Sequence, residues 1–223
     1  MKLYSYVVMH DTGFAPNPFF GYCTLACCKP KIRQTAEQGD WIVGLTPKAA
    51  GNRIVYLMRV DEVVSSFADY WTDRRFGVKK PAHNDGVRGR CGDNIYEPLP
   101  NGDYRQLPSM HSNGETEDKE KKEHDLSGTR ILISETFAYF GSNALPLPPE
   151  LRSLVVARGH RSQFSEEVKL EFVRFAGSVG FGVHGAPGRW PDGDDSWTED
   201  GGCKPRKSES KPRKTDCKLR KCK

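Results

Sequence analysis

Three thiols and three basic side chains lie within eleven residues near the start of the chain. A thiolate next to a cation is an activated nucleophile, and clustered thiols can also ligate a metal ion. A connecting loop needs neither, so this segment is the first candidate for a functional site. Its members are Cys23, Cys27, Cys28, Lys29, Lys31 and Arg33.

The spacing of the cysteines favours packing over metal binding. The pattern C-x3-C-C lacks the paired C-x2-C hooks of structural zinc sites, and no close histidine completes a tetrahedral set. Cys91 could supply a fourth ligand only through folding. Three interpretations stay open: buried and unreactive thiols, a metal site, and a reactive thiolate beside the basic residues. We favour the first and predict no metal ligand.

The basic half of the segment offers a contact for phosphate. Pro30 fixes the local backbone, and Arg33 presents a planar fork of donors close in sequence to the ammonium group of Lys29. The alternative is a turn in which both cations are solvated. We predict Lys29 and Arg33 as phosphate-binding residues.

Polar residues at predicted strand ends and in loops form a second group of candidates. Asp11 follows the first predicted strand, Asn17 lies between two prolines, and Asp93 and Asn94 are adjacent in a loop. Such side chains often cap turns, but they can also act as general bases or hydrogen-bond a nucleobase edge. We predict Asp11 and Asp93 as catalytic candidates, and Asn17 and Asn94 as nucleotide-binding residues.

The run Arg158-Gly159-His160-Arg161 combines two guanidinium groups with an imidazole. It would suit an anion, and an exposed loop is the alternative. Because imidazole titrates near neutral pH, His160 is the candidate for proton transfer, and Arg158 and Arg161 are predicted phosphate contacts. Four histidines in weakly patterned loops receive no role: His83, His111, His124 and His184.

Hydrophobic patterning predicts the elements that must position these groups. Runs of β-branched and aromatic residues predict strands over 2–9, 39–45, 53–60, 130–134 and 137–141, and helices are predicted within 61–71, near 148–151 and over 165–177. Residues 79–125 read as a long insertion with brief strands at 94–96 and 104–107. Long loops of this kind are usually functional or disordered. We therefore predict one domain over 1–182 with this insertion.

The charge of the chain is unevenly distributed. Ten Lys or Arg against two acidic residues from Cys203 to Lys223 give this segment a charge of +8, so the other residues carry −3 of the total of +5. The composition predicts a disordered basic tail over 183–223 that would contact DNA or RNA. The remainder is slightly acidic, so its bulk charge does not identify a ligand.

Several protein classes find no support in the sequence. No apolar run approaches the roughly 20 residues that span a bilayer, and the N-terminus lacks the pattern of a signal peptide. Seven cysteines, three of them crowded, fit a reducing compartment. We expect a cytoplasmic protein with no membrane partner. The common phosphate-loop, serine-hydrolase, zinc-protease and deaminase motifs are absent.

Five runs are distinctive as a group: 11–19, 23–30, 92–96, 137–141 and 158–161. Together they resemble the second of the nucleotide modification associated domains of bacteria and phages, over about residues 1–180. That family is linked with base-modification and bacterial defence gene sets. The resemblance implies a nucleotide, nucleic acid or modified base as partner, and it leaves the reaction and any cofactor unknown.

The strands at 39–44 and 54–60 are similar to those of PUA-like and EVE-like barrels, which hold modified bases. This likeness implies an α+β fold: a small mixed, mostly antiparallel β-barrel with peripheral helices and long loops. We expect the candidate residues to surround one pocket that binds, or also processes, a nucleotide or modified base. The alternatives are a non-enzymatic reader and an interaction or defence protein that acts through its basic tail.

Overall fold

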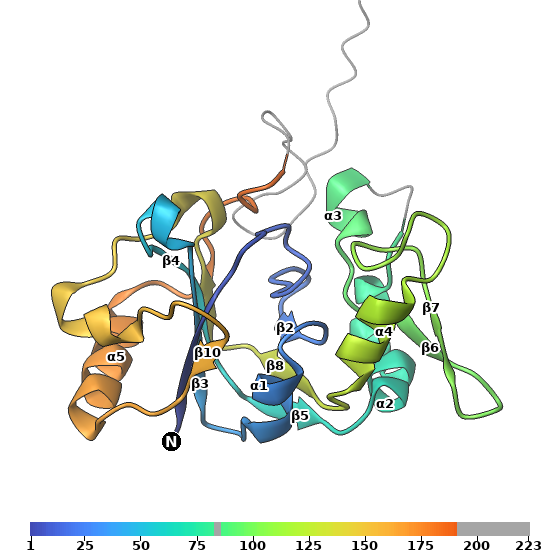
Figure 1. Ribbon diagram of the computed structural model, residues 1–223, viewed down its shortest axis with the longest axis horizontal. Helices are drawn as coiled ribbons and strands as arrows, with labels where there is room; N and C mark the ends of the chain where they lie inside the picture. Colours follow the sequence, from blue (N-terminus) through green and yellow to red (C-terminus); the bar gives the residue numbers. More distant parts are fainter. Residues whose placement is uncertain (83–85, 191–223) are drawn as a thin grey trace, which may run out of the picture.

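The computed structural model describes residues 1–82 and 86–190 and shows a mixed α+β fold (Figure 1). Its largest sheet has six strands in the order β10-β1-β3-β4-β9-β11. The pairs β1/β3 and β9/β11 are parallel, and the other neighbours are antiparallel. The strands are β1 (Leu3–Val7), β3 (Trp41–Leu45), β4 (Ile54–Arg59), β9 (Phe137–Tyr139), β10 (His160–Arg161) and β11 (Gly182–Val183).

Two smaller sheets and several short helices complete the described part. One sheet has the antiparallel order β2-β8-β5, and the other is the pair β6-β7. Their strands are β2 (Cys23–Leu25), β5 (Glu62–Val64), β6 (Tyr96–Pro98), β7 (Tyr104–Gln106) and β8 (Ile131–Ser134). The α-helices are α1 (Pro30–Thr35), α2 (Phe67–Thr72), α3 (Gly86–Arg90), α4 (Lys119–Leu126) and α5 (Glu166–Ser178), and the 3-10 helices are η1 (Lys48–Ala50), η2 (Arg74–Lys79), η3 (Gly141–Asn143) and η4 (Pro149–Leu154).

The predicted PUA-like β-barrel is wrong, because the sheets formed by residues 1–82 and 86–190 are open. The edge strands β10 and β11 are two residues long, and each pairs with one neighbour in the large sheet. After β4 the chain leaves this sheet, and β5 pairs with β8 in another one. The strands are therefore divided among separate sheets and do not close around one interior.

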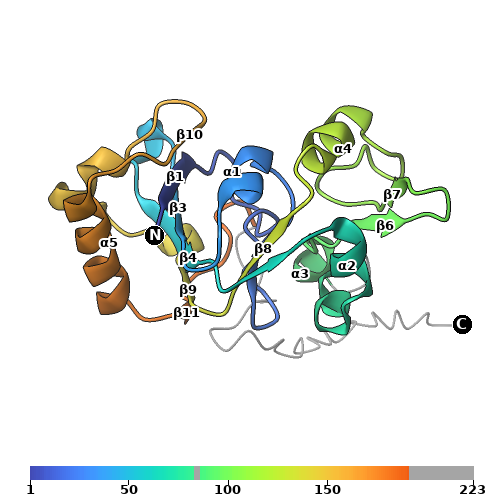
Figure 2. The same cartoon turned by 90° about the horizontal axis from the view of Figure 1, so that it is seen from below.

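Side-chain alternation gives the large sheet two apolar faces. One face, which includes Leu3 and Leu57, packs against η4 and α5. The opposite face, which includes Tyr6 and Ile42, packs against α1. Figure 2 shows α5 and α1 on opposite sides of the sheet. A side chain on an outer strand must therefore face either α1 or α5, and this decides which residues can share a site.

Within the region predicted as an insertion, 79–125, residues 79–82 and 86–125 are an ordered part of the fold. They contribute α3, β6, β7 and α4, which lie with α2 on the far side of the β2-β8-β5 sheet (Figure 1). A third apolar cluster, which includes Phe67, Tyr70 and Phe76, holds this half together. Helix α4 was not predicted, because its sequence is almost entirely polar; Asp118 caps it by accepting from the Lys121 N–H.

Two other boundaries differ from the sequence patterns. The predicted helix within 61–71 begins only at Phe67, because residues 62–64 pair with β8 as strand β5. Residues 183–190 pack on the domain: the Trp190 ring lies 5.5 Å from that of Phe19, and its Nε1 donates to the Thr12 carbonyl at 2.9 Å. The rest of the predicted tail, 191–223, lies outside the described residues. No described helix is both long and apolar enough to cross a membrane.

Candidate active site

Cys28 lies on a tight turn between strand β2 and helix α1. Cys28 and Lys29 both have left-handed backbone conformations, with φ of 59° and 41°. Left-handed conformations are unfavourable for residues with a Cβ, and they persist where surrounding contacts hold them. Pro30 then starts the helix, as its fixed φ favours. A half-buried thiol is thus presented on a strand-turn-helix junction, a geometry that many nucleophiles share.

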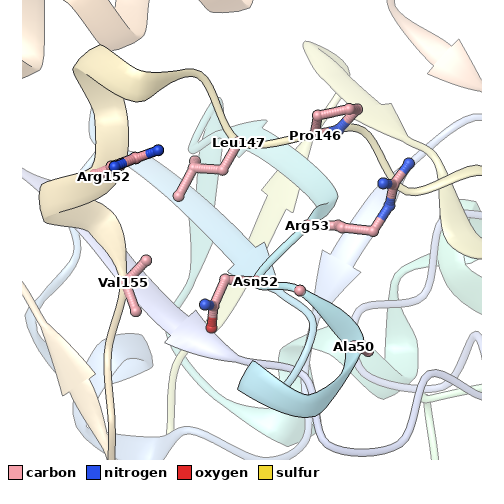
Figure 3. Close-up of a pocket in the computed structure, with 8 residues that line it drawn as sticks. Ala50, Asn52, Arg53, Pro146, Leu147, Arg152 and Val155 are labelled. Atoms are coloured by element: carbon pink, nitrogen blue, oxygen red, sulfur yellow. The ribbon is translucent and has the colours of Figure 1, made fainter.

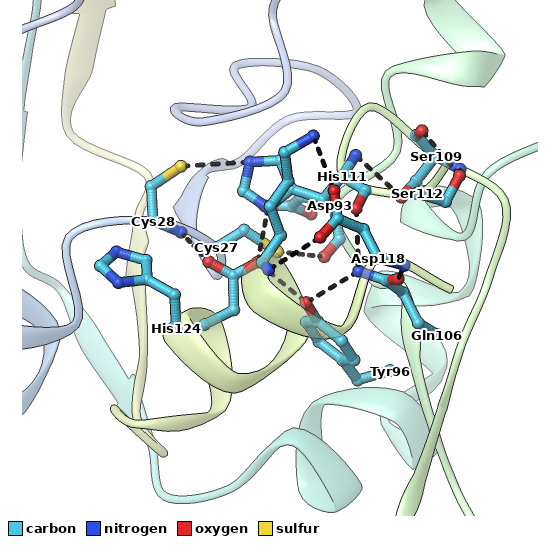
Figure 4. A network of polar contacts seen from close by, with 12 residues as sticks. Cys27, Cys28, Asp93, Tyr96, Gln106, Ser109, His111, Ser112, Asp118 and His124 are labelled. Carbon is cyan, nitrogen blue, oxygen red and sulfur yellow. Dashed lines mark hydrogen bonds and ion pairs between the residues drawn. The ribbon is translucent and has the colours of Figure 1, made fainter. Parts of the chain in front are cut away.

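His111 and Asp125 complete a Cys-His-Asp arrangement around this thiol. The Cys28 Sγ lies 3.4 Å from His111 Nε2, and His111 Nδ1 lies 2.6 Å from the Asp125 Oδ2. Figure 4 shows the His111 ring facing the Cys28 sulfur. The Cys28 N–H donates to Asp125 Oδ1 at 2.7 Å, so the same carboxylate fixes both the base and the nucleophile. These are the contacts of a nucleophile, its base and an orienting acid.

The surroundings of the triad favour a protonated His111. Burial acts to lower the pKa of His111, but its hydrogen bonds to Asp125 and Cys28 outweigh burial and raise that pKa to about 9. Burial likewise opposes ionisation of Asp125, but His111 and the Cys28 N–H hold its pKa below the usual value. At neutral pH both ring N–H groups of His111 are therefore donors, one to the carboxylate and one to the sulfur.

The loop after β7 is held by its own polar contacts. Gln106 Nε2 donates to the His111 carbonyl at 3.1 Å, while its Oε1 accepts from the Asp118 N–H at 2.7 Å. The His111 N–H donates to Ser109 Oγ at 3.2 Å, and the Phe14 ring lies 4.7 Å from the imidazole. These hydrogen bonds and the contact with Phe14 hold the loop that carries His111 in position.

Arg33, a predicted phosphate contact, is fully buried and directs its donors to backbone carbonyls. Its Nε donates to the Cys28 carbonyl at 2.8 Å, and its two terminal nitrogens donate to the carbonyls of Asp125, Gly128 and Arg130. The guanidinium thereby ties the Cys28 turn to the end of α4. This placement supports a positioning role for Arg33 and does not support phosphate contact.

Gly128 lets the end of α4 approach helix α1. A Cβ at this position would lie 2.8 Å from the Cα and 2.9 Å from the carbonyl oxygen of Pro30, so backbone would have to move. We expect Gly128→Ala to lower the free energy of unfolding by about 1–3 kcal/mol and to slow alkylation of Cys28, because α4 carries Asp125. Chemical denaturation and peptide-resolved alkylation measure the two effects.

Gly177→Ala is the matched control for this change. Nothing lies within 4 Å of a Cβ built on Gly177, which is inside helix α5. Ala favours a helix over Gly by up to about 1 kcal/mol, so this variant should be as stable as the parent or slightly more so. Equal stability of Gly128→Ala and the parent would show that the close approach is not needed.

The neighbouring cysteines differ from Cys28. Cys23 and Cys27 are fully buried, and burial raises the pKa of Cys23 to about 12 and that of Cys27 well above its usual value. Cys27, His111 and Asp125 nevertheless place three ligand atoms within 4.8 Å of one another, a spacing that could hold a metal ion. The cysteine pattern gave no sign of this group, because its other two members are distant in sequence.

Three further predicted site residues, Asn17, Asp93 and Asn94, are buried with Lys79 in a separate polar network. Lys79 Nζ donates to Asn17 Oδ1 at 2.6 Å, and burial lowers the pKa of Lys79 to about 8. The Asp93 carboxylate accepts from the hydroxyls of Thr24 and Tyr70 at 2.6 and 2.8 Å, and burial raises its pKa. Asn94 Nδ2 donates to two backbone carbonyls. These contacts support roles in holding the fold together.

Asp11 fastens residues 188–190 to the domain. Its carboxylate accepts from the Tyr139 hydroxyl at 2.5 Å and from the Gly188 N–H at 2.8 Å, and burial raises its pKa. Its carbonyl accepts from the Arg189 N–H at 2.8 Å. Among the described residues, the hydrogen bonds of Asp11 do not reach the triad, so the structure does not bring this catalytic candidate to His111.

The residues of the predicted anion-binding run at 158–161 do not lie together, because His160 and Arg161 form strand β10 and face opposite sides of the sheet. Arg161 is the register partner of Ser5, whose hydroxyl bonds to η4, and Arg161 donates to the Ser153 carbonyl at 3.0 Å. His160 pairs with Tyr6 and faces the α1 side, as alternation along a strand requires. Arg158 is exposed in the preceding loop. His160 is thus on the Cys28 side of the sheet, and Arg161 is on the other.

The described residues also form a cavity away from the triad. A depression of about 530 Å³ is lined by residues 50–53, 146–147, 152 and 155, which surround η1 and η4 (Figure 3). Arg53 and Arg152 border it, and Arg53 Nε is bound to the Ala144 carbonyl at 2.7 Å. It shares no residue with the triad. The triad and this depression are therefore two different candidate sites. We give the triad more weight, because three reactive side chains meet there in hydrogen-bond contact.

A comparison with protein families connects this geometry with a biological setting. A family model described as nucleotide modification associated domain 2 matches residues 1–193. The chain belongs to this family. Neither a curated protein nor a solved structure matches the chain. The membership confirms the family that the five sequence runs predicted, and it associates the domain with nucleotide modification.

In this nucleotide modification associated domain, sequence reasoning missed the base and the orienting acid. His111 lies in a polar loop and Asp125 in a charged segment, and neither has a local motif. One local feature could have indicated Cys28: Pro30 starts a helix, so this thiol lies in the turn that precedes the helix. The pairing of these segments is a tertiary contact that no spacing rule gives.

Proposed function

We propose that this nucleotide modification associated domain is an enzyme that uses Cys28 as a covalent nucleophile in modifying a nucleotide or nucleobase. The observation that carries the proposal is the 3.4 Å contact of Cys28 Sγ with His111 Nε2, with His111 Nδ1 held by Asp125. A domain that merely binds a base needs stacking and hydrogen-bonding groups and has no use for this constellation.

The proposed step is attack of the Cys28 thiolate on an electrophilic carbon of the substrate. A sulfur–carbon bond forms, the bond from that carbon to its leaving group breaks, and His111 Nε2 gives its proton to the leaving group. Water or an amine then attacks the same carbon, returns a proton to His111, and displaces the thiolate. Asp125 keeps the imidazole oriented through both halves.

A zinc site at Cys27, His111 and Asp125 is the second candidate, and the spacing of their ligand atoms favours it. Two observations weigh against it. The Asp125 oxygens already accept from the Cys28 N–H, His111 Nδ1 and the Tyr96 hydroxyl, and Cys27 faces the Asp93 carbonyl at 3.6 Å. A metal would have to replace these bonds and deprotonate a buried thiol.

The test compares the alkylation rate of Cys28 in the native protein with that of the same residue in the urea-unfolded chain at pH 6.5. Peptide mass spectrometry separates Cys28 from the other cysteines. We expect the native rate to be at least about tenfold higher, because the protonated His111 ring places a positive charge 3.4 Å from the Cys28 sulfur. In cells, a modified nucleoside should accompany the parent and be lost with Cys28→Ala.

Two results would contradict the proposal. An equal or slower native rate would show Cys28 to be an inert thiol. Purification with one equivalent of zinc, accompanied by protection of the cysteines until the zinc is chelated, would assign the cluster to metal binding.

A further inference from the structure

Two basic groups lie on the face of the large sheet that carries Cys28. Lys29 follows Cys28 directly, and its ammonium lies 4.7 Å from the centroid of the Tyr6 ring. His160 is the register partner of Tyr6, and its ring centroid lies 6.3 Å from that of Tyr4. Tyr4 and Tyr6 are two residues apart on β1 and share one face. Lys29 and His160 therefore border the same strand, next to the candidate nucleophile.

Lys31, on the first turn of α1, completes the group. Burial, and then the charges of Lys31 and Lys29, lower the pKa of His160, which agrees with both ammonium groups lying near the imidazole. Lys31 is exposed, while Lys29 and His160 are half-buried. Lys29 lies in the turn before α1, Lys31 in α1 and His160 in β10. Figure 2 shows α1 and β10 near the same end of β1.

Among the described residues, the ammonium groups of Lys29 and Lys31 form no ion pair with a carboxylate. Some other lysines do have carboxylate partners, as Lys122 has in Glu117 and Lys169 has in Glu166. Adjacent positive groups without a counter-charge create a potential that attracts an anion.

We propose that Lys29, Lys31 and His160 bind a phosphate group of the substrate beside Cys28. This inference rests on the proposed function, because it supplies the binding group for the substrate on which Cys28 acts. Donors that converge from separate elements suit the tetrahedral array of phosphate oxygens, whereas a carboxylate is best matched by one planar fork. The phosphate belongs either to a free nucleotide or to a nucleic-acid strand, which present the same acceptor oxygens.

Paired probes test the charge around Cys28. Iodoacetate and iodoacetamide have the same leaving group, but iodoacetate carries a negative charge. We expect the rate ratio of iodoacetate to iodoacetamide at Cys28 to fall about two- to fivefold in Lys31→Gln at low ionic strength and neutral pH. Lys31→Glu should lower it further. His160→Gln should change the ratio less, because the lowered pKa of His160 leaves the imidazole mostly neutral there. Lys48→Gln, on η1 and away from this group, is the matched control and should keep the parental ratio.

Protection experiments identify the source of the phosphate. Millimolar 5′-dAMP, a short single-stranded oligonucleotide, inorganic phosphate and deoxyadenosine are each tested against iodoacetamide alkylation of Cys28. Protection by 5′-dAMP but not by the oligonucleotide indicates a free nucleotide, and the reverse indicates a nucleic-acid strand. In either case Lys31→Glu should abolish the protection, and deoxyadenosine should protect less than 5′-dAMP.

The inference can fail while the proposed function stands. A fast native reaction of Cys28 with iodoacetamide, together with unchanged probe ratios in the Lys31 variants and no protection by any phosphate compound, would overturn the phosphate site alone. A slow native reaction with iodoacetamide would instead overturn the nucleophile. The two failures therefore give different results in the same assay.

Discussion

His111→Gln should slow the alkylation of Cys28 at pH 6.5 by about 10- to 100-fold. The imidazolium of His111 donates to the Cys28 sulfur from 3.4 Å, and a neutral amide cannot replace its charge. Peptide-resolved iodoacetamide kinetics measure the rate. Circular dichroism and thermal melting establish that the variant is folded.

The matched control for this variant is His124→Gln. His124 lies on α4 directly before Asp125, is exposed, and is drawn on the Cys28 side of the network in Figure 4. Its removal should change the rate less than about twofold, as expected of an exposed charge in water. If His124→Gln slowed the reaction and His111→Gln did not, the assignment of the base would be wrong.

The parent protein and His111→Gln should also differ in how their free energy of unfolding depends on pH. The pKa of His111 is raised in the folded state to about 9, from an ordinary value near 6.5. Its protonated form therefore stabilises the fold fully below pH 6.5, and this contribution, on the order of 3 kcal/mol, is lost as the pH rises through 9. The difference in unfolding free energy between the parent and His111→Gln should shrink accordingly, and urea denaturation across this range checks it.

Arg33→Met should lower the free energy of unfolding by about 3–5 kcal/mol, the largest loss of stability that we expect. The guanidinium is fully buried and supplies donors to four backbone carbonyls, including that of Cys28. Met fills similar space but leaves those carbonyls without a donor. Each buried carbonyl without a hydrogen bond lowers the free energy of unfolding. Urea denaturation at pH 7 measures the change.

Arg130→Met is the control for this substitution. Arg130 lies close to Arg33, which donates to its carbonyl, but its own guanidinium forms a partly exposed pair with Glu37 at 3.0 Å. Such pairs contribute about 0–1 kcal/mol. Similar losses in both variants would show that the Arg33 network does not stabilise the junction between α1 and α4.

Much of the secondary structure could be predicted, because it depends on local patterns. The runs at 39–45 and 53–60 became β3 and β4, and Ser165 caps α5 by accepting from the Val168 N–H. Helix α4 could not be predicted in this way: its residues are polar, and its position depends on contacts of Asp125 and Arg33. The predicted barrel failed for a related reason, since strand pairing is a long-range property.

The sequence by itself determined the family, the strands β1, β3 and β4 of the large sheet, and the cluster of thiols and cations around the start of α1. These follow from residue types within short windows, where side-chain pattern and backbone preference act. Only the tertiary structure decided which groups meet. His111 and Asp125 contact Cys28 although more than eighty residues of chain separate them from it. Arg33 is buried and donates to backbone carbonyls of two segments. His160 and Arg161 lie on opposite faces of the sheet. Such choices depend on packing between distant segments, which local preferences do not specify.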